Sequence, residues 1–593
     1  MNKIILYFDY LKRFNGSQLI HLIKSRSSNM SLFRARNRPL KSSDRIDDTS
    51  LEDFLIRYKL LFTTKDEHSV IIDEVCKGEL VKDKYYNELQ NRLIKSMEKN
   101  ELSESIWSTY DSSDIEIQNN FFRFHLFSEA ATSVKLTSSL RKQLILKWLS
   151  IKVQDKIAQN SFNCALRLFN WFKLISKLEP TDFSFQEWRQ IKDSIFNQIL
   201  FVNRNIEHHI PGNHVFIQLF MIWMAAALFP KWIRSKEILN CYSIKLTTEV
   251  EKQFLKESGL HFELSTHYHV QILQFLLLWI NASRRIDINV SPNVESTAKK
   301  ALHSFTHLCF SDEYIPILGD NCYPFIHSSL RSDIKNILQL NSSLFNDNLT
   351  LHKNENKNLI IDIDQQYLVS IIKDSKVILD VGELGYPPNP GHGHSDLMSI
   401  VYFDKIPVLI DPGTRRYTNN PEDLLLKNSR SHNTISINNK DYAILWGFFR
   451  WSFLPDKPIY STKCADTGNI LDVSYKWLKI QPGITQKRKI FHNESLVEII
   501  DFIEGDMTAD VTSNFILHQD IKYELINNQI KLSAPENSWN VSVESNSNFA
   551  INIHPFTIYL QYNLPEESNR IKIVFKKARF PIEIKTTITR LEA

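Results

Sequence analysis

The polar stretch that decides the fold is NSSLFNDNLTLHKNENKN, residues Asn341–Asn358, because the hydrophobic pattern of the chain changes across it. The stretch has little periodicity, which is typical of a boundary between domains. Before it, from about Ile106 to about Leu340, apolar residues recur at helical spacing, as in Leu166, Phe169, Trp171, Phe172 and Ile175. After it come short alternating runs bounded by Gly, Pro, Asn and Asp. The sequence therefore predicts a helical N-terminal half and a β-structured C-terminal half.

The helical half contains two strongly apolar segments, Val215–Phe229 and Val270–Ile280. Each is too short to span a bilayer and is flanked by His and charged residues, so both are interpreted as buried core helices and no membrane span is expected. Successive helices without intervening strand signals are typical of a helical solenoid or of a closed ring of helix pairs.

The C-terminal half shows short strand-like runs without intervening helices, which is typical of an antiparallel sandwich. The first of these runs are Tyr367–Ile372, Val377–Val381, Ser399–Phe403, Val408–Ile410 and Thr434–Ile437. The predicted domains are a helical extension at residues 1–105, a helical domain at 106–350 and a β-sandwich at 355–593. Within the extension, helices are expected at Leu51–Phe62 and Tyr85–Met97.

Composition limits the function classes. The chain has 593 residues, 43% of them hydrophobic and 23% charged, which is typical of a soluble globular protein with more than one core. A net charge of +4 is small for a chain of this size and does not indicate a nucleic-acid-binding protein. The six cysteines form no CxxC pair, which argues against a disulfide framework and a cysteine-based zinc site. No secretion signal is readable at the N-terminus. The cytoplasm is therefore the default expectation, with the periplasm or cell envelope left open, and the oligomeric state is also left open.

The strongest local motif is Gly391-His-Gly-His-Ser-Asp396, followed by Asp411-Pro-Gly-Thr414 and Ser431-His-Asn-Thr434. Residues i and i+2 of an extended segment share a face, so His392 and His394 can point into one cleft. The side chains of His394, Asp411 and His432 offer two imidazoles and a carboxylate, a ligand set that suits zinc. Alternatively, Asp411 only starts the turn at Pro412-Gly413, and His432 is a hydrogen-bonded residue at the end of a strand.

A second cluster, Glu207-His-His-Ile-Pro-Gly-Asn-His214, directly precedes the first apolar helix. Asn213 is well placed to cap that helix, which is the simpler interpretation. A helix N-terminus beside an Asn amide and an imidazole also forms a site for a carboxylate, because unpaired N–H groups and the positive end of the dipole face it.

A third cluster, Gly259-Leu-His-Phe-Glu-Leu-Ser-Thr-His-Tyr-His269, precedes the second apolar helix. Three histidines, Glu263 and Tyr268 form an unusually polar edge on an apolar element. Tyr268 alone is more often a packing tyrosine whose hydroxyl is satisfied at the surface.

Taken together and in this order, the three clusters resemble the heparinase II/III-like polysaccharide lyases. This family has an incomplete (α/α) toroid followed by an antiparallel β-sandwich. Further matching segments are Ala165–Trp171, Gly212–His214, Ser265–His269, Arg430–Thr434 and Trp446–Arg450. The resemblance covers most of the chain.

The resemblance also implies roles for individual residues. Asn213 and His214 would hold a uronic-acid carboxylate, Tyr268 would be the catalytic base or acid, and His392 the second proton-transfer group. A structural zinc would be held by His394, Asp411 and His432. Sugar-binding positions would be His208, His209, Glu263, His269 and Arg430.

The implied reaction is β-elimination on an acidic polysaccharide. The C5 proton of a uronate is removable only if the carboxylate is neutralised and the enolate-like intermediate is stabilised. One tyrosine can serve as base and acid if the proton and the leaving oxygen depart from one face, and His392 covers the opposite-face case. The signal-less form looks like members associated with bacterial surface or capsular polysaccharide. Two alternatives stay open, a non-catalytic glycan-binding or assembly factor and a zinc-dependent glycan hydrolase.

Overall fold

The computed structural model describes residues 3–14, 49–62, 95, 99, 115–127, 136–150, 158–210, 212–232, 234–311, 314–321, 330–345, 358–386, 390–526, 528–535 and 537–591. The helices of the N-terminal half are α1 (Lys3–Leu11), α3 (Leu51–Phe62), α6 (Ile115–Phe122), η2 (His125–Phe127), α8 (Ser138–Ser150), α9 (Ser161–Ser176), α10 (Phe185–Arg204), α11 (Asn213–Leu228), α12 (Ser235–Gln253), α13 (Thr266–Arg285), α14 (Pro292–Leu308) and α15 (Leu330–Phe345). The C-terminal half adds α16 (Pro421–Leu425) and η3 (Ser429–Ser431).

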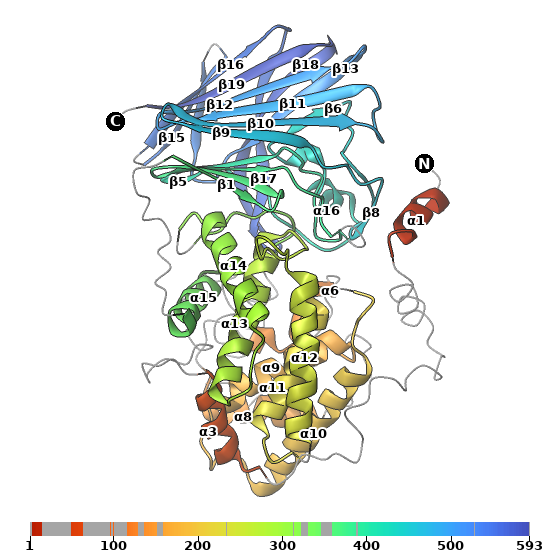
Figure 1. Ribbon diagram of the computed structural model, residues 1–593, viewed down its shortest axis with the longest axis vertical. Helices are drawn as coiled ribbons and strands as arrows, with labels where there is room; N and C mark the ends of the chain where they lie inside the picture. The colour runs from red at the N-terminus through yellow and green to blue at the C-terminus, as the bar shows by residue number, and fades with distance from the viewer. Residues whose placement is uncertain are drawn as a thin grey trace.

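Helices α11 and α13 are the two central helices of this half (Figure 1). In α11 every residue except His214 is buried, and in α13 every residue from Thr266 to Ser283 is buried. Helices that are apolar around their whole circumference must be covered on all sides. The neighbours α3, α9, α12, α14 and α15 provide this cover. Among the described residues, no helix is both long and apolar enough to cross a membrane.

The strands of the C-terminal half form antiparallel sheets with no helix crossing between adjacent strands. A five-stranded sheet contains β1 (Leu359–Ile363), β2 (Tyr367–Ile372), β3 (Ser375–Asp380), β4 (Ile400–Asp404) and β5 (Ile406–Leu409). An eight-stranded sheet has the order β14 (Lys522–Ile526), β15 (Gln529–Ala534), β16 (Asn537–Ser545), β19 (Ile582–Leu591), β12 (Leu496–Glu504), β11 (Ile484–His492), β10 (Gly468–Trp477) and β9 (Ile459–Ala465). A four-stranded sheet has the order β17 (Ala550–Gln561), β18 (Leu564–Arg579), β13 (Thr508–Ile516) and β6 (Ile435–Ile437), and β7 (Ile444–Gly447) pairs with β8 (Arg450–Ser452).

The five-stranded sheet lies between the helices and the rest of the sandwich (Figure 1). All six residues of β2 are buried. Tyr367, Val369 and Ile371 belong to the helical core, whereas Leu368 belongs to the sandwich core. Because successive side chains of a strand point to opposite faces, β2 contributes to both cores. The two halves are thus packed on either side of one shared sheet.

The predicted fold is confirmed: a helical half matching the incomplete toroid precedes an antiparallel β-sandwich. The described parts of residues 1–105 divide between the two halves. Phe54 of α3 packs against Phe172 and Phe229 in the helical core, and the expected helix Leu51–Phe62 is present. Helix α1 lies beside β8 instead (Figure 1). The helix expected at Tyr85–Met97 lies almost entirely outside the described residues.

Candidate active site

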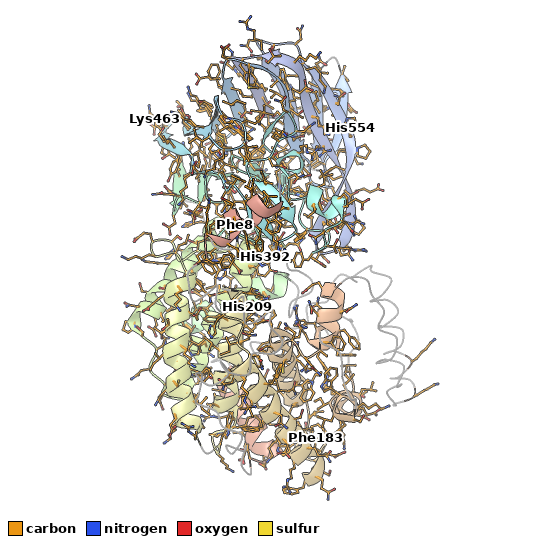
Figure 2. The ribbon with its side chains drawn as sticks, turned by 90° about the vertical axis from the view of Figure 1, so that its right-hand side faces the viewer. Phe8, Phe183, His209, His392, Lys463 and His554 are labelled. Carbon is orange, nitrogen blue, oxygen red and sulfur yellow. The ribbon has the colours of Figure 1, made fainter. Side chains whose placement is uncertain are left out.

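At the junction of the two halves, hydrogen bonds connect the start of α13 to the loops that carry the predicted site residues. Ser265 caps the helix by accepting a hydrogen bond from the Tyr268 backbone N–H at 3.2 Å, and its hydroxyl donates to the backbone carbonyl of Asp320 at 2.7 Å. The backbone N–H of Asp320 donates to the carbonyl of His392 at 2.8 Å. Figure 2 shows His209 and His392 at this junction. The helix that carries Tyr268 and the GHGHSD loop are therefore held together through Asp320.

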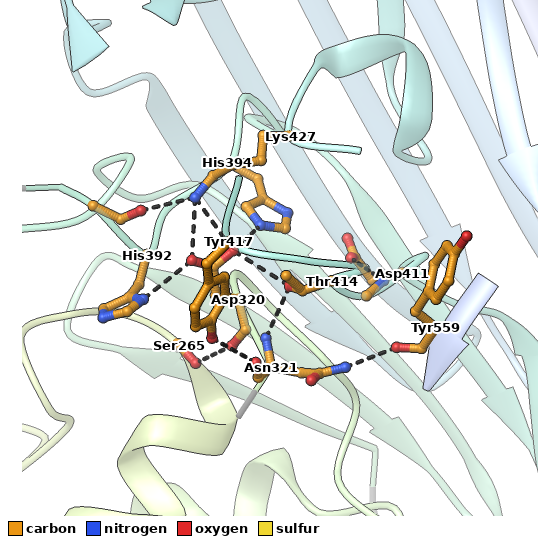
Figure 3. Close-up of polar contacts among 12 residues, drawn as sticks. Ser265, Asp320, Asn321, His392, His394, Asp411, Thr414, Tyr417, Lys427 and Tyr559 are labelled. Carbon is orange, nitrogen blue, oxygen red and sulfur yellow. Dashed lines mark hydrogen bonds and ion pairs between the residues drawn. The ribbon is translucent and has the colours of Figure 1, made fainter. Parts of the chain in front are cut away.

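The Asp320 carboxylate is the centre of a buried hydrogen-bond cluster (Figure 3). Its Oδ2 accepts from His392 Nδ1 at 3.1 Å, and its Oδ1 accepts from His394 Nε2 at 2.8 Å. Lys427 Nζ lies 3.2 and 3.1 Å from the two oxygens, and the Thr414 hydroxyl donates to Oδ1 at 3.3 Å. Four side chains from three loops thus converge on one carboxylate that has no exposed surface.

Electrostatics keep this carboxylate ionised. Burial alone would raise the pKa of Asp320, but the Lys427 ammonium and the hydrogen bonds from His392 and His394 outweigh it and hold the pKa well below its usual range. Lys427 also donates to the Gly391 carbonyl at 2.7 Å, and its ammonium lies 4.3 Å from the centre of the Phe448 ring. The buried Lys427 ammonium is therefore stabilised by a carboxylate, a backbone carbonyl and an aromatic ring.

The Tyr268 phenol lies against the His392 imidazole, with ring centroids 4.0 Å apart. The Tyr268 and Tyr417 hydroxyl oxygens are 3.1 Å apart, and the Tyr417 hydroxyl donates to the Asn321 carbonyl at 2.7 Å. Because Tyr417 has a single hydroxyl hydrogen and gives it to Asn321, Tyr268 is the donor between the two phenols. The two predicted proton-transfer residues are therefore adjacent, and the Tyr268 proton points along a defined hydrogen bond.

Asn213 and His214 form the first turn of α11. The Asn213 amide donates to Gln271 Oε1 at 3.3 Å, one turn of α13 beyond Tyr268. His214 is stacked on Phe162 with ring centroids 3.7 Å apart, and its Nδ1 lies 2.7 Å from Glu207 Oε2. Because Phe162 covers one face of the His214 ring and Glu207 contacts Nδ1, the edge with Nε2 is the part that can contact a ligand.

Glu263 lies close to this helix start and interacts electrostatically with His392. Its carboxyl group accepts from the Asn213 backbone N–H and interacts electrostatically with His392 and His214. Burial raises the pKa of Glu263 in spite of these favourable partners. Gly212 has a φ of 121°, a backbone conformation that favours glycine, and a Cβ atom there would also lie 2.1 Å from Glu263 Oε1. The structure thus brings Asn213, His214, Glu263 and His392 to one region.

The group of possible metal ligands in the structure contains Asp396, where the sequence predicts Asp411. The ligand atoms of His394, Asp396 and His432 all lie within 4.8 Å of one another, and all three residues are buried. Asp411 instead lies behind His432, with its Oδ2 2.7 Å from His432 Nδ1. A carboxylate in such contact with a metal-binding histidine can orient its ring.

The donor atoms of this group fit a metal ion. His394 Nδ1 and His432 Nε2 are buried and have no hydrogen-bond partner among the described residues. Most buried ring nitrogens are paired, so two unpaired nitrogens close to one carboxylate form a set of donors that a cation can join. Two imidazoles and a carboxylate suit zinc. Each imidazole is also backed by a carboxylate, His394 by Asp320 and His432 by Asp411.

The remaining predicted substrate-binding residues have different environments. His208 and His209 lie half-buried in the loop before α11. His269 is fully buried, accepts from the His261 backbone N–H at 3.2 Å and donates to the Ala301 carbonyl at 3.1 Å, so the structure does not bring it to the site. Arg430 lies against β18, where Arg570 donates to its backbone carbonyl at 2.9 Å.

Several residues of the cluster were not predicted. Asp320 and Asn321 follow Gly319 in a short loop, and this Gly-Asp-Asn sequence was the one available signal. Tyr417 follows the DPGT motif by three residues, and Lys427 ends the apolar run Leu424–Leu426. No periodicity or spacing distinguishes Lys427 from a surface lysine.

Comparison with protein families gives matches to both halves. The description "Heparinase II/III N-terminus" matches residues 84–350, and "Heparinase II/III-like, C-terminal" matches residues 362–587. The chain belongs to the heparinase II/III-like family. Both matches lie on the expected side of the boundary between α15 and β1.

Solved structures share the fold of this heparinase II/III-like chain at low identity. "Crystal Structure of Heparinase III" has a TM-score of 0.66 at 14% identity and covers 97% of this chain and 89% of that chain. A heparan sulfate lyase mutant from Pedobacter heparinus has a TM-score of 0.58 at 14% identity, covering 92% and 88%. The chondroitin AC lyase of Streptomyces coelicolor A3 in complex with chondroitin sulphate has a TM-score of 0.50 at 10% identity, covering 92% and 83%. A search of curated proteins gave no match.

Proposed function

We propose that this heparinase II/III-like polysaccharide lyase cleaves a uronic-acid-containing polysaccharide by β-elimination. The observation that carries the proposal is the contact of the Tyr268 phenol with the His392 imidazole, next to the start of α11 that presents Asn213 and His214. These groups supply the two functions that the reaction needs, neutralisation of a carboxylate and transfer of a proton.

Carboxylate binding is assigned to the start of α11. The Asn213 amide, the His214 ring and the positive end of the helix dipole favour a negative group there. Glu263 lies at the same place, where burial raises its pKa and so disfavours a second negative charge beside a bound uronate. His208, His209 and Arg430 remain assigned to flanking sugars.

Proton transfer is assigned to Tyr268, supported by His392, on a single face of the sugar. Ring centroids 4.0 Å apart are in van der Waals contact, so no sugar ring fits between the two side chains. A base and an acid on opposite faces are therefore disfavoured. The favoured substrates are those in which the C5 hydrogen and the C4 oxygen share a face, namely glucuronate and mannuronate rather than guluronate, iduronate or galacturonate.

Zinc is assigned to His394, Asp396 and His432, with Asp411 orienting His432. A bound divalent ion would supply fixed positive charge and rigidity beneath the GHGHSD loop. Because all three ligand residues are buried, a role in holding the loop is favoured over activation of a water for hydrolysis. The polymer is proposed to be a bacterial surface or capsular polysaccharide, on the strength of the sequence resemblance, and the cell envelope or the cytoplasm is its place of action.

The experiment compares polymannuronate with polyguluronate, which differ only at C5, together with glucuronan, heparosan and surface polysaccharide from the producing cells. Elimination creates an unsaturated uronate that absorbs in the ultraviolet, and mass spectrometry shows products without added water. We expect cleavage of at least one mannuronate or glucuronate polymer and none of polyguluronate. Products carrying added water would show a hydrolase, and binding of these polymers without any product would show a non-catalytic binding factor.

A variant assigns the proton transfer. Tyr268→Phe is expected to lower kcat by about 10²–10⁴-fold, the usual contribution of a general acid or base, with little change in binding. Tyr475→Phe, in the sandwich core against Trp477, is the matched control and is expected to leave kcat unchanged. Equal activity of Tyr268→Phe and the wild type would remove Tyr268 from the mechanism.

A further inference from the structure

The Asp320 carboxylate contacts both the proton-transfer histidine and a histidine of the metal group. We propose that Asp320 is the positioning residue of the site, which orients the His392 imidazole toward the sugar and the His394 imidazole toward the metal ion through one carboxylate. The catalytic half of this inference rests on the proposed function, whereas the metal-binding half stands independently of it.

The orientation of His394 follows from its hydrogen bonds. An ionised carboxylate only accepts, so His394 Nε2 carries the hydrogen that it donates to Asp320 Oδ1 at 2.8 Å. In a neutral imidazole the other nitrogen then has a lone pair. That nitrogen, Nδ1, is the buried atom without a partner among the described residues, and it belongs to the group with Asp396 and His432. Asp320 therefore selects the tautomer that can bind a metal.

The same argument holds for His392. Its Nδ1 donates to Asp320 Oδ2 at 3.1 Å, which directs the opposite nitrogen, Nε2, away from Asp320. Of the two histidines, only His392 has a partly exposed side chain, at 18% against 0% for His394. One carboxylate thus presents one imidazole to the side that solvent reaches and the other to the buried metal group.

Asp320 is itself fixed in place by hydrogen bonds of its backbone and of its side chain. Its backbone N–H is bonded to the His392 carbonyl and its backbone carbonyl to Ser265, the residue that caps the helix of Tyr268. Lys427 contacts both carboxylate oxygens, so rotation of the carboxylate would break contacts on both sides. The same residue is therefore bonded to the metal group, to His392 and to the start of the helix that carries Tyr268.

The experiment uses Asp320→Asn in the full chain. An amide cannot accept from both histidines in the same way, because one of its two positions is a donor. Zinc affinity, measured by competition with a coloured chelator, is expected to fall about 10–100-fold, the usual effect of losing the partner of a metal-binding histidine. At saturating zinc, kcat is expected to stay at least tenfold below the wild type with KM nearly unchanged, because His392 remains misoriented.

A second variant guards against misfolding, because Asp320→Asn leaves the Lys427 ammonium buried without a counter-charge. The double variant Asp320→Asn, Lys427→Met removes that charge and is expected to show the same loss of zinc affinity. The control is Asp404→Asn, a buried carboxylate of the sandwich that accepts from Trp539 Nε1 at 2.8 Å and lies outside the cluster. It is expected to lower the thermal midpoint without changing zinc affinity.

A spectroscopic readout separates this inference from the lyase assignment. In ¹⁵N-histidine spectra of the metal-free wild type, we expect His394 as the Nε2–H tautomer and His392 as the Nδ1–H tautomer, with His392→Gln and His394→Gln used for assignment. If no polymer is cleaved, these spectra and the zinc competition still decide the inference. Unchanged tautomers and zinc affinity in both Asp320 variants would overturn it, whatever the activity of the wild type.

Discussion

At the scale of single residues, the site depends on carboxylates that orient histidines. His394 and His432 each use one ring nitrogen for a carboxylate, Asp320 or Asp411, and direct the other toward Asp396. An unpaired buried ring nitrogen destabilises the folded protein by about 1–3 kcal/mol. A bound ion would pair these nitrogens and remove this destabilisation. Metal binding and stability are therefore expected to be linked.

The two aspartates that were candidates for the third ligand can be compared directly. Asp396→Asn removes the carboxylate that lies within the group of ligand atoms, whereas Asp411→Asn removes only the partner of His432 Nδ1. We expect zinc affinity to fall by more than 100-fold in the first variant and by about 10–100-fold in the second. Zinc competition measures both, and a larger loss in Asp411→Asn would restore Asp411 as the direct ligand.

His492 gives a pH-dependent contribution to stability. It lies between the hydroxyls of Ser370 and Ser375, each at 2.8 Å, and burial lowers its pKa to about 3 from the ordinary 6.5. A depressed pKa means that the stability it contributes is present above pH 6.5 and is lost as the pH falls toward 3. The expected extra slope is about 1.4 kcal/mol per pH unit.

The variant His492→Gln tests this slope, because Gln keeps a donor and an acceptor but does not titrate. Urea denaturation of both proteins between pH 4 and 6.5 is expected to show a shallower loss of stability in the variant. Parallel curves would show that His492 already titrates normally in the folded protein.

Sequence patterns located residues in motifs better than residues in loops. The spacing of His392 and His394 predicted that the two share a face, and the resemblance to the lyase family predicted that Tyr268 lies with His392. Asp320 and Lys427 are paired across more than a hundred residues of chain, so no local pattern identifies either one. Asp396 stood in the quoted motif, but only the three-dimensional positions favour it over Asp411.

At the scale of elements, α1 supports the β7–β8 hairpin beside the site. The Phe453 backbone N–H donates to Asp9 Oδ2 at 2.9 Å, and the Ser452 hydroxyl donates to the Leu6 carbonyl at 2.8 Å. The turn of this hairpin carries Phe449, whose ring lies 5.7 Å from that of His392. Contacts of an N-terminal helix thus reach the candidate active site through one hairpin.

This support can be tested with two neighbouring variants. Asp9→Ala removes an acceptor of the hairpin and is expected to cost about 0.5–1.5 kcal/mol of local stability, seen as faster hydrogen–deuterium exchange in residues 444–453. Lys12→Ala removes only an exposed ion-pair partner of Asp9, because the Lys12 side chain is 70% accessible. This variant is expected to change the exchange little. Equal exchange rates in the two variants would show that α1 does not hold the hairpin.

The elements themselves followed from periodicity. Strand β2 was predicted with the bounds that the structure gives, and β3 to β6 to within about two residues. Which half α1 contacts could not be predicted, because a short helix with an apolar run such as Ile4–Phe8 gives no indication of the surface that covers it.

At the scale of the whole molecule, the shared five-stranded sheet makes the two halves depend on each other. Ile371 of β2 packs in the helical core, and Leu368 of the same strand packs in the sandwich core. The change at Asn341–Asn358 was sufficient to predict two halves. Their sharing of one sheet was not predicted, because a strand buried on both faces gives the same apolar run as any buried strand.

Ile371→Ala tests this dependence. Removing a buried Ile side chain typically costs 2–5 kcal/mol, and if the halves unfold as one unit, protection from exchange is expected to fall in α11 and α13 and equally in β11 and β12. Calorimetry is expected to show a single transition at a lower temperature. A loss confined to the helices, or two separate transitions, would show that the halves unfold independently.

The shared sheet also bears on how such a protein can be made and altered. A gene fragment that encodes only the helices would expose the helical surface that β2 covers. A fragment that encodes only the strands would expose Tyr367, Val369 and Ile371 to water. Exposed apolar surface of this kind promotes aggregation. Chimeras that exchange one half between relatives are therefore expected to stay in solution only when the sheet and the helices that cover it come from the same parent.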